Sequence, residues 1–219
     1  MKNIKNLKNK EFDKWFLRNV NSYNDNSLDE RIINLLKNNN IHADKILEIG
    51  CANGFKLNQY SKILKTKINY GVDLSKKAIL SGKKKYKNLN LFNISSLEID
   101  KIKHNFDLII CGFFLYQLDR ELIFNQFDLI YKKLNKNGLL LINDFDPLFK
   151  HSNRDFNSKN SMSYKMSYDT FLIESGLFEL IYKFKYKTST NDKRKFKSDK
   201  VSFNLFKKID FLKQYPENV

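Results

Sequence analysis

Cysteine is scarce in this chain of 219 residues, which contains only Cys51 and Cys111. Two cysteines are too few for the disulfide framework of a small secreted protein, and we interpret both as packing residues, with neither a disulfide nor a metal site. Long apolar runs are also absent, since no stretch approaches the roughly 20 residues of a membrane-spanning helix. The N-terminus lacks the apolar region of a signal peptide. We therefore expect a soluble, cytoplasmic protein without membrane insertion.

Acidic residues are outnumbered, with 24 Asp and Glu against 40 Lys and Arg and a net charge of +16. Such a balance is common in nucleic-acid-binding proteins. Lysine here accompanies abundant asparagine, isoleucine, phenylalanine and tyrosine, which share AT-rich codons, so a biased genome is a competing cause. The clusters 83–85 and 193–195 could contact phosphate, but a solvated surface is the favoured interpretation. A nucleic-acid partner stays open without being favoured.

A glycine turn after a short apolar strand is the most informative pattern. Residues 46–54 read as a strand that contains Glu48 and runs into a turn with Gly50 and Gly54. Glycine lets a backbone approach a ligand closely, because it has no side chain and tolerates positive φ. The spacing is not the G-x-G-x-x-G of dinucleotide-binding proteins. A helix over 55–64 should follow.

The next segments alternate between expected strands and helices. A strand over 68–73 ends in Asp73, with Ser75 as the N-cap of a helix, and residues 89–94 form a third short strand. The apolar run 106–116 is typical of a parallel strand buried on both faces. A helix over 119–134, stopped by Asn137-Gly138, then leads to a strand over 139–143.

These features resemble class I S-adenosylmethionine-dependent methyltransferases, whose first motif has the form E-x-G-x-x-x-G. The resemblance implies an α/β, Rossmann-like fold: a mostly parallel seven-stranded sheet with helices on both faces. It also implies a C-terminal antiparallel hairpin, for which residues 178–187 and 201–206 are the candidate strands. Ala52 stands where the family more often has glycine, which is a mild departure.

The resemblance also implies S-adenosylmethionine as cofactor and a set of residues around it. Asp73 would hold the ribose hydroxyls, Leu74 would lie against the adenine, and the side-chain oxygen of Asn93 could accept a hydrogen bond from the adenine amino group. The complete set of expected cofactor-binding residues is Glu48, Gly50, Cys51, Ala52, Gly54, Asp73, Leu74, Asn93, Ile94, Cys111 and Arg18.

The ends of the chain are expected to lie outside the catalytic domain. We predict an N-terminal lid or packing segment over residues 1–26, a methyltransferase domain over 27–210 and a tail over 211–219. Arg18 could pair with the methionine carboxylate and Tyr23 could help close the pocket; the alternative is a surface helix packed by Trp15 and Phe16. Ser27 to Glu30 form a capping box that opens a helix.

Acceptor chemistry should lie in the polar loop 143–154, at the carboxyl edge of the sheet. Asp144, Asp146 and His151 can accept protons there, so each is a candidate general base, although the sequence assigns no catalytic residue. Cys111 follows Ile110 and not the proline of cytosine-carbon methyltransferases, and the Asp/Asn-Pro-Pro-Tyr signature of enzymes acting on planar amino groups is absent.

The predicted function is methyl transfer to an oxygen or nitrogen of a small molecule. The Asp-Phe-Asp-Pro loop followed by Tyr-Lys-x-x-Tyr is similar to bacterial methyltransferases found with surface-glycan genes, which favours a sugar or glycan precursor. Two alternatives stay open: an RNA or ribosomal-protein methyltransferase that uses the basic surface, and a non-catalytic cofactor-binding module. Oligomeric state is not indicated.

Overall fold

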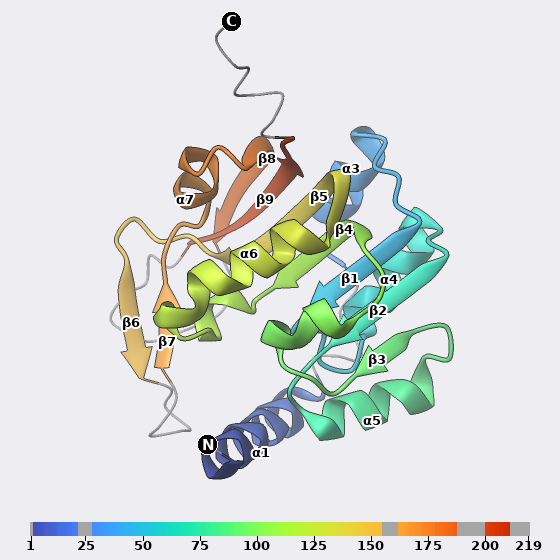
Figure 1. The fold of residues 1–219 in the computed structure, drawn as a ribbon, viewed down its shortest axis with the longest axis vertical. Helices are drawn as coiled ribbons and strands as arrows, with labels where there is room; N and C mark the ends of the chain where they lie inside the picture. The colour runs from blue at the N-terminus through green and yellow to red at the C-terminus, as the bar shows by residue number, and fades with distance from the viewer. Residues whose placement is uncertain (1, 22–27, 155–161, 188–199, 211–219) are drawn as a thin grey trace, which may run out of the picture. The chain divides into compact units, whose positions relative to one another are not determined.

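The computed structural model describes residues 2–21, 28–154, 162–187 and 200–210 (Figure 1). The chain forms two compact units, Met1–Leu108 and Ile109–Val219, and each is described by itself. Seven strands form one sheet in the order β3-β2-β1-β4-β5-β9-β8, and β6 and β7 form a second, two-stranded sheet. The predicted class, a mostly parallel α/β sheet with an antiparallel C-terminal strand pair, is confirmed.

The first unit alternates helices and short parallel strands. Its elements are α1 (Lys2–Asn19), α3 (Glu30–Asn38), β1 (Lys45–Ile49), α4 (Phe55–Leu64), β2 (Ile68–Val72), α5 (Lys76–Lys85), β3 (Asn90–Phe92) and the 3-10 helix η1 (Ser96–Lys101). Parallel pairing sets Glu48 of β1 opposite Gly71 of β2. Consecutive strands joined by helices favour this arrangement, because a parallel pair needs a long crossover.

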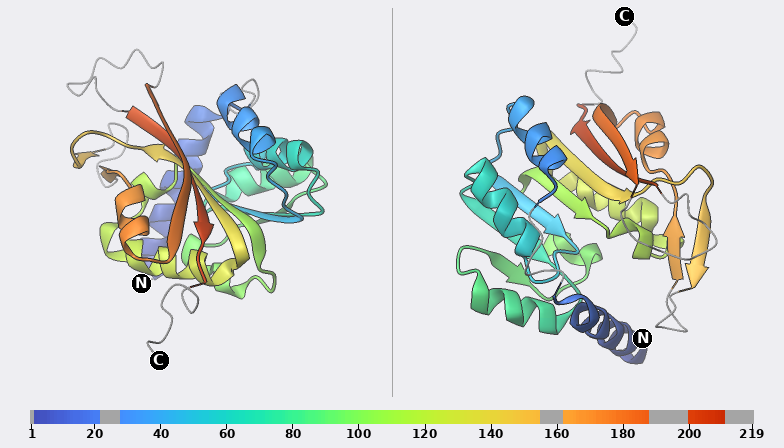
Figure 2. Two further views of the ribbon diagram at one scale, coloured as in Figure 1. Left: turned by 90° about the horizontal axis from the view of Figure 1, so that it is seen from above. Right: turned by 180° about the vertical axis from the view of Figure 1, so that it is seen from behind.

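The second unit is dominated by antiparallel pairing. Its elements are η2 (Leu115–Gln117), η3 (Arg120–Leu122), α6 (Ile123–Lys133), β5 (Leu134–Phe145), β6 (His151–Arg154), β7 (Met162–Lys165), α7 (Asp169–Glu174), β8 (Phe178–Lys187) and β9 (Lys200–Lys208). The strand β4 (Phe106–Gly112) contributes residues to both units. In this unit β9 pairs antiparallel with both β5 and β8, as Figure 2 shows from two further sides.

Two predicted elements end earlier than expected. The strand expected over 106–116 stops at Gly112, because Phe113 adopts a positive φ of 51° and donates its backbone N–H to Asn143 O at 2.8 Å. The helix expected over 119–134 is divided into η3 and α6, and β5 begins at Leu134, five residues before the predicted strand.

The N-cap of α3 is Asp29 and not Ser27, which lies outside the described residues. Asp29 accepts the backbone N–H of Arg31 at 2.9 Å and also pairs with its guanidinium, so that the same carboxylate caps the helix and neutralises a cation. By contrast, Ser75 is the N-cap of α5, as predicted, and accepts the N–H of Ala78.

The polar loop predicted over 143–154 was wrong at both ends. Residues 143–145 continue β5, and His151–Arg154 form β6, which pairs antiparallel with β7. This small sheet has polar side chains on both strands, which leaves no apolar alternation to reveal it in the sequence. Among the described ranges, none of the helices has the length and apolar character needed to span a membrane.

Candidate functional site

The glycine turn in the first unit is closed by the end of the neighbouring strand. The backbone N–H groups of Gly50 and Cys51 both donate to Val72 O, at 2.9 and 3.1 Å, and Gly54 N–H donates to Cys51 O at 2.8 Å. Gly50 and Gly54 have φ values of 72° and 76°, which glycine adopts without strain. Ala52 has a φ of 49° in the same turn, so this position favours glycine even though the chain carries alanine.

Asp73 binds the turn from the end of β2. Its Oδ2 accepts the backbone N–H of Ala52 at 2.9 Å, and its Oδ1 accepts that of Ser75 at 2.7 Å. Burial raises the pKa of this carboxyl, while the two N–H groups act in the opposite direction. Each carboxylate oxygen has a second lone pair, so Asp73 can still accept ligand hydroxyls.

Asn93 lies beside Asp73 in an exposed position. Its amide nitrogen donates to the backbone carbonyls of Asp73 and Leu74, both at 2.9 Å. The side-chain oxygen has no partner among the residues that the structure describes. The structure thus brings Asp73, Leu74 and Asn93 together, with Ile94 next in the chain and half-buried.

The buried side chain of Glu48 indicates whether the site suits a ligand with a positive charge. Its side chain is 3% exposed, and Oε2 has no hydrogen-bond partner within the described part of the chain. Burial raises the pKa of Glu48 to about 8, against the charge of Lys56 and the backbone N–H of Leu57. An orphaned buried carboxylate oxygen is costly. A cationic or N–H donor such as the methionine ammonium of S-adenosylmethionine would satisfy it.

The cysteines and Arg18 take different positions. Cys51 is buried in the turn, and burial raises the pKa of its thiol. Cys111 is fully buried in the part of β4 that belongs to the second unit, and neither cysteine forms a disulfide with a described residue. Arg18 is exposed in the last turn of α1. Tyr23, the predicted closing residue, lies outside the described residues.

In the second unit, Asp144 is buried and binds the backbone of two aromatic residues. Its Oδ2 accepts the backbone N–H of Tyr116 at 3.2 Å, and its Oδ1 accepts that of Phe145 at 2.7 Å. The rings of Tyr116 and Phe145 meet edge to face with centroids 5.1 Å apart. Burial raises the pKa of Asp144 to about 7, against these N–H groups and the charge of Arg120.

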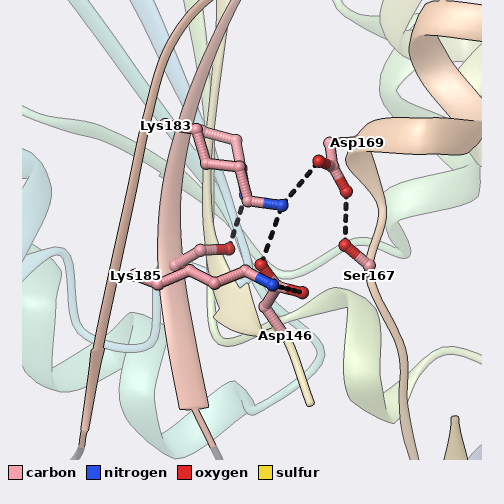
Figure 3. Close-up of polar contacts among 7 residues, drawn as sticks. Asp146, Ser167, Asp169, Lys183 and Lys185 are labelled. Atoms are coloured by element: carbon pink, nitrogen blue, oxygen red, sulfur yellow. Dashed lines mark hydrogen bonds and ion pairs between the residues drawn. The ribbon is translucent and has the colours of Figure 1, made fainter. Parts of the chain in front are cut away.

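Asp146 follows β5 and lies at the centre of an ion-pair network (Figure 3). Its two oxygens pair with Lys183 and Lys185 of β8, each at 3.0 Å, and Lys183 also pairs with Asp169 at 2.5 Å. Burial alone would raise the pKa of Asp146, but its interactions with Lys183, Ser167 and Lys185 lower it overall. A carboxylate held by two lysines is a weak base.

His151, the third candidate base, stands on β6, where its Nδ1 lies 3.0 Å from Phe149 O. The structure therefore places Asp144, Asp146 and His151 in one unit, but in three different environments. Among the described residues, no group of three or more His, Cys, Asp and Glu side chains could hold a metal ion.

Several residues of these networks were missed in the sequence. Arg120 donates to the carbonyls of Leu115 and Leu118, and its guanidinium lies over the ring of Tyr164 at 5.1 Å. Its place inside an apparent helix hid this role. Lys183 and Lys185 are two residues apart on an edge strand, and this spacing, which puts both ammonium groups on one face, was a usable signal.

Comparison with known proteins identifies the fold. A family model described as a methyltransferase domain matches residues 40–200. An uncharacterised protein from Rickettsia prowazekii, RP028, is 34% identical over 107 residues. That match covers 47% of this chain and 43% of the relative, so the chain spans less than half the length of the curated protein that it matches.

Solved structures share the fold at lower identity. The N-methyltransferase NodS from Bradyrhizobium japonicum WM9, in complex with S-adenosyl-L-homocysteine, has a TM-score of 0.61 at 18% identity, covering 86% of this chain and 91% of that one. An O-methyltransferase from a Brevibacillus brevis multienzyme, in complex with the same molecule, has a TM-score of 0.65 at 15% identity, with coverages of 84% and 72%.

Proposed function

Because the chain belongs to the class I S-adenosylmethionine-dependent methyltransferase family, we propose that it transfers a methyl group to an oxygen or nitrogen of a small molecule. The observation that carries this proposal is the turn of Gly50–Gly54, bound to Asp73 and lying next to the orphaned oxygen of Glu48. A sugar or surface-glycan precursor is the favoured acceptor. An N-methyltransferase and an O-methyltransferase share the fold, so the acceptor atom stays open.

We assign the proposed cofactor contacts to side-chain oxygens that can still accept hydrogen bonds. Asp73 accepts the ribose hydroxyls, Asn93 Oδ1 accepts the adenine amino group, and Glu48 Oε2 accepts the methionine ammonium. Leu74 and Ile94 supply apolar contact to the adenine. The turn residues and the remaining expected contacts complete the set: Gly50, Cys51, Ala52, Gly54, Cys111 and Arg18.

The bound sulfonium supplies an already activated methyl group, so the protein contributes mainly alignment of the acceptor and exclusion of water. A hydroxyl acceptor also needs a base. Asp144 has a pKa near neutrality, but its oxygens accept two backbone N–H groups. Asp146 is neutralised by two lysines. As a residue, half-buried His151 is more exposed than either carboxylate, although its Nε2 atom is buried, and we propose it first.

The division into an N-terminal segment (1–26), a catalytic domain (27–210) and a tail (211–219) stays part of this proposal. So does a cytoplasmic location.

Titration calorimetry with S-adenosylmethionine and S-adenosyl-L-homocysteine tests the proposal. We expect binding in the micromolar range by wild type and a loss of about tenfold or more in Asp73→Ala, since a charge-assisted hydrogen-bonding group is removed. Asp128→Ala, which removes an exposed carboxylate on α6, is the matched control. No detectable binding of either compound by wild type would reject the proposed enzyme.

The RNA or ribosomal-protein alternative depends on the basic surface. Lys83, Lys84 and Lys85 are exposed in the last turn of α5, whereas the cluster 193–195 lies outside the described residues. RNA binding that weakens steeply with salt would favour this alternative, and no binding at low salt would remove it.

A further inference from the structure

The helix α1 is anchored to the first turn of α5 by one carboxylate. Oδ1 of Asp13 accepts the Ser75 hydroxyl at 2.7 Å and the backbone N–H of Lys77 at 2.9 Å. The Ser75 oxygen in turn accepts the N–H of Ala78 at 3.1 Å. N–H groups in the first turn of a helix have no partner within the helix. Asp13 and Ser75 therefore cap α5 together, although α1 and α5 are far apart in the sequence (Figure 1).

The capping residue is also bound to the candidate cofactor site. The backbone N–H of Ser75 donates to Asp73 Oδ1, and Asp73 Oδ2 accepts the N–H of Ala52. Consecutive hydrogen bonds thus run from Asp13 through Ser75 and Asp73 to the glycine turn. A shift of α1 would be transmitted to the carboxylate that is assigned the ribose contacts.

Apolar packing joins the same elements by a second route. Phe16, one turn beyond Asp13, forms a buried cluster with Ala52 of the turn and Ala78 of α5, and Val20 packs against it. Phe16 is 3% exposed and Ala52 8%. The methyl group of Ala52, at the position where glycine is more frequent in the family, is part of this contact.

We propose that Asp13 is a positioning residue for the cofactor: docking of α1 through Asp13 holds Ser75, Asp73 and Ala52 in the arrangement that binds S-adenosylmethionine. This inference rests on the proposed function, because it takes Asp73 as the ribose ligand. Coupling between two binding events is reciprocal, so cofactor binding must also stabilise the docked position of α1.

The charge of Asp13 has a separate consequence. Burial is the main cause that raises the pKa of Asp73, and Asp13 adds to it, while the N–H groups of Ser75 and Ala52 oppose it. Among the described residues, Glu48 of β1 and Cys51 of the turn also interact electrostatically with Asp73. Cofactor affinity should fall as the pH falls through the pKa of Asp73, because a protonated carboxyl loses acceptor capacity. We call this part of the pH profile the acid limb. Removing the charge of Asp13 lowers the pKa of Asp73 and so moves the acid limb to lower pH.

The experiment measures the Kd of S-adenosyl-L-homocysteine by calorimetry between pH 4.5 and 8, with the melting temperature of each variant. We expect Asp13→Ala to raise the Kd about tenfold at pH 7.5. Asp13→Asn keeps an acceptor oxygen, so it should recover most of this loss and still shift the acid limb to lower pH. Glu11→Gln, which removes an exposed ion pair with Lys14 on the same helix, should stay within about twofold of wild type.

Trp15, the single tryptophan of the chain, reports on α1 without any cofactor turnover. Acrylamide quenching of Trp15 should decrease when S-adenosyl-L-homocysteine binds wild type, and should be greater in Asp13→Ala without ligand. If Asp13→Ala does not fold, Ser75→Ala provides the same test, because it removes the hydroxyl that joins α1 to α5.

The outcomes separate the two proposals. An Asp13→Ala protein with wild-type affinity, beside an Asp73→Ala protein with weakened affinity, would overturn the positioning role and leave the proposed function intact. Unchanged affinity in Asp73→Ala would instead reject the assigned cofactor site. Weakened affinity in both, with the acid limb shifted in Asp13→Asn, is the expected result.

Discussion

Gly82 of α5 lies so close to the glycine turn that a Cβ atom added to it would come within 2.2 Å of the backbone oxygen of Asn53. The obstructing atom belongs to the backbone and not to a flexible side chain, so the turn itself would have to move. Absence of a side chain at Gly82 is therefore a condition for the shape of the turn between Gly50 and Gly54.

We expect Gly82→Ala to destabilise the protein by about 1–3 kcal/mol through overpacking, although alanine is the better helix former. Affinity for S-adenosyl-L-homocysteine should fall as well, because the displaced oxygen belongs to the turn. Urea denaturation and calorimetry measure the two effects. Lys84→Ala, at an exposed position of the same helix, is the control, and a Gly82→Ala protein as stable as this control would contradict the close approach.

Glu48→Gln should separate stability from binding. The pKa of Glu48 is about 8 in the folded protein against 4.5 ordinarily, so the folded state disfavours its charge and stability declines as the pH rises between these values. The neutral amide should therefore raise the melting temperature at pH 8. It should also weaken S-adenosylmethionine binding about tenfold, since a carboxylate facing an ammonium is lost.

Scanning fluorimetry and calorimetry provide the two measurements for Glu48→Gln, and Glu179→Gln at an exposed position of β8 is the matched control. A variant that binds the cofactor as tightly as wild type would show that the orphaned oxygen does not meet the ammonium.

Asp144→Asn tests the carboxylate that accepts the backbone N–H groups of Tyr116 and Phe145. An amide can accept only one of the two backbone N–H groups well, and its NH₂ would face the other, which should cost about 1–3 kcal/mol. The wild-type pKa of about 7 lies above the ordinary 3.8, so the stability contributed by this group is greatest at low pH and declines towards pH 7. The deficit of the variant should therefore be larger at pH 5 than at pH 8, as measured by urea denaturation. A deficit independent of pH would contradict the raised pKa.

Lys183→Met tests the network around Asp146, a residue only 1% exposed. Loss of this cation leaves the carboxylates of Asp146 and Asp169 without their shared partner. We expect the free energy of unfolding to fall by about 2 kcal/mol at pH 7. This is less than for a fully buried pair, because Lys183 is 22% exposed. Since the pKa of Asp146 is lowered in the folded protein, this stability should vanish as the pH falls through that pKa.

The matched control for Lys183→Met is Lys132→Met, whose exposed pair with Asp128 should contribute less than about 1 kcal/mol. A double-mutant cycle of Lys183→Met with Asp146→Asn isolates the pair, and a coupling energy of zero would remove the network as a source of stability.

The sequence predicted correctly those features that depend on consecutive strand, turn and helix segments. Ser75 caps α5 as predicted, and Asp73 lies at the end of β2 beside the turn, because the turn, the strand end and the helix start are contiguous in parallel α/β units. The seven-stranded sheet was implied by the resemblance to class I methyltransferases, and the structure confirms it.

Elements set by distant partners were not predictable in the same way. β6 has few apolar residues and exists through its pairing with β7, and the strand after Gly112 is interrupted by a positive φ at Phe113. Tyr116, a partner of Asp144, and Lys183, a partner of Asp146, lie about 30 and 40 residues away in the sequence. The pKa shifts of the two carboxyl groups could therefore not be predicted from their sequence neighbours. Asp13 was missed because its partner, Ser75, lies 62 residues further along the chain.

The two outer strands of the seven-stranded sheet bear on how copies of the protein can associate. An edge strand exposes unpaired backbone groups that another chain can extend, which is a common origin of aggregation. At one edge β3 has only three residues, and at the other β8 is irregular between Leu180 and Tyr182 and carries Lys183 and Lys185. Short, bulged and charged edges resist continuation of a sheet. Any assembly of this protein is therefore expected to form through surfaces other than strand-to-strand addition.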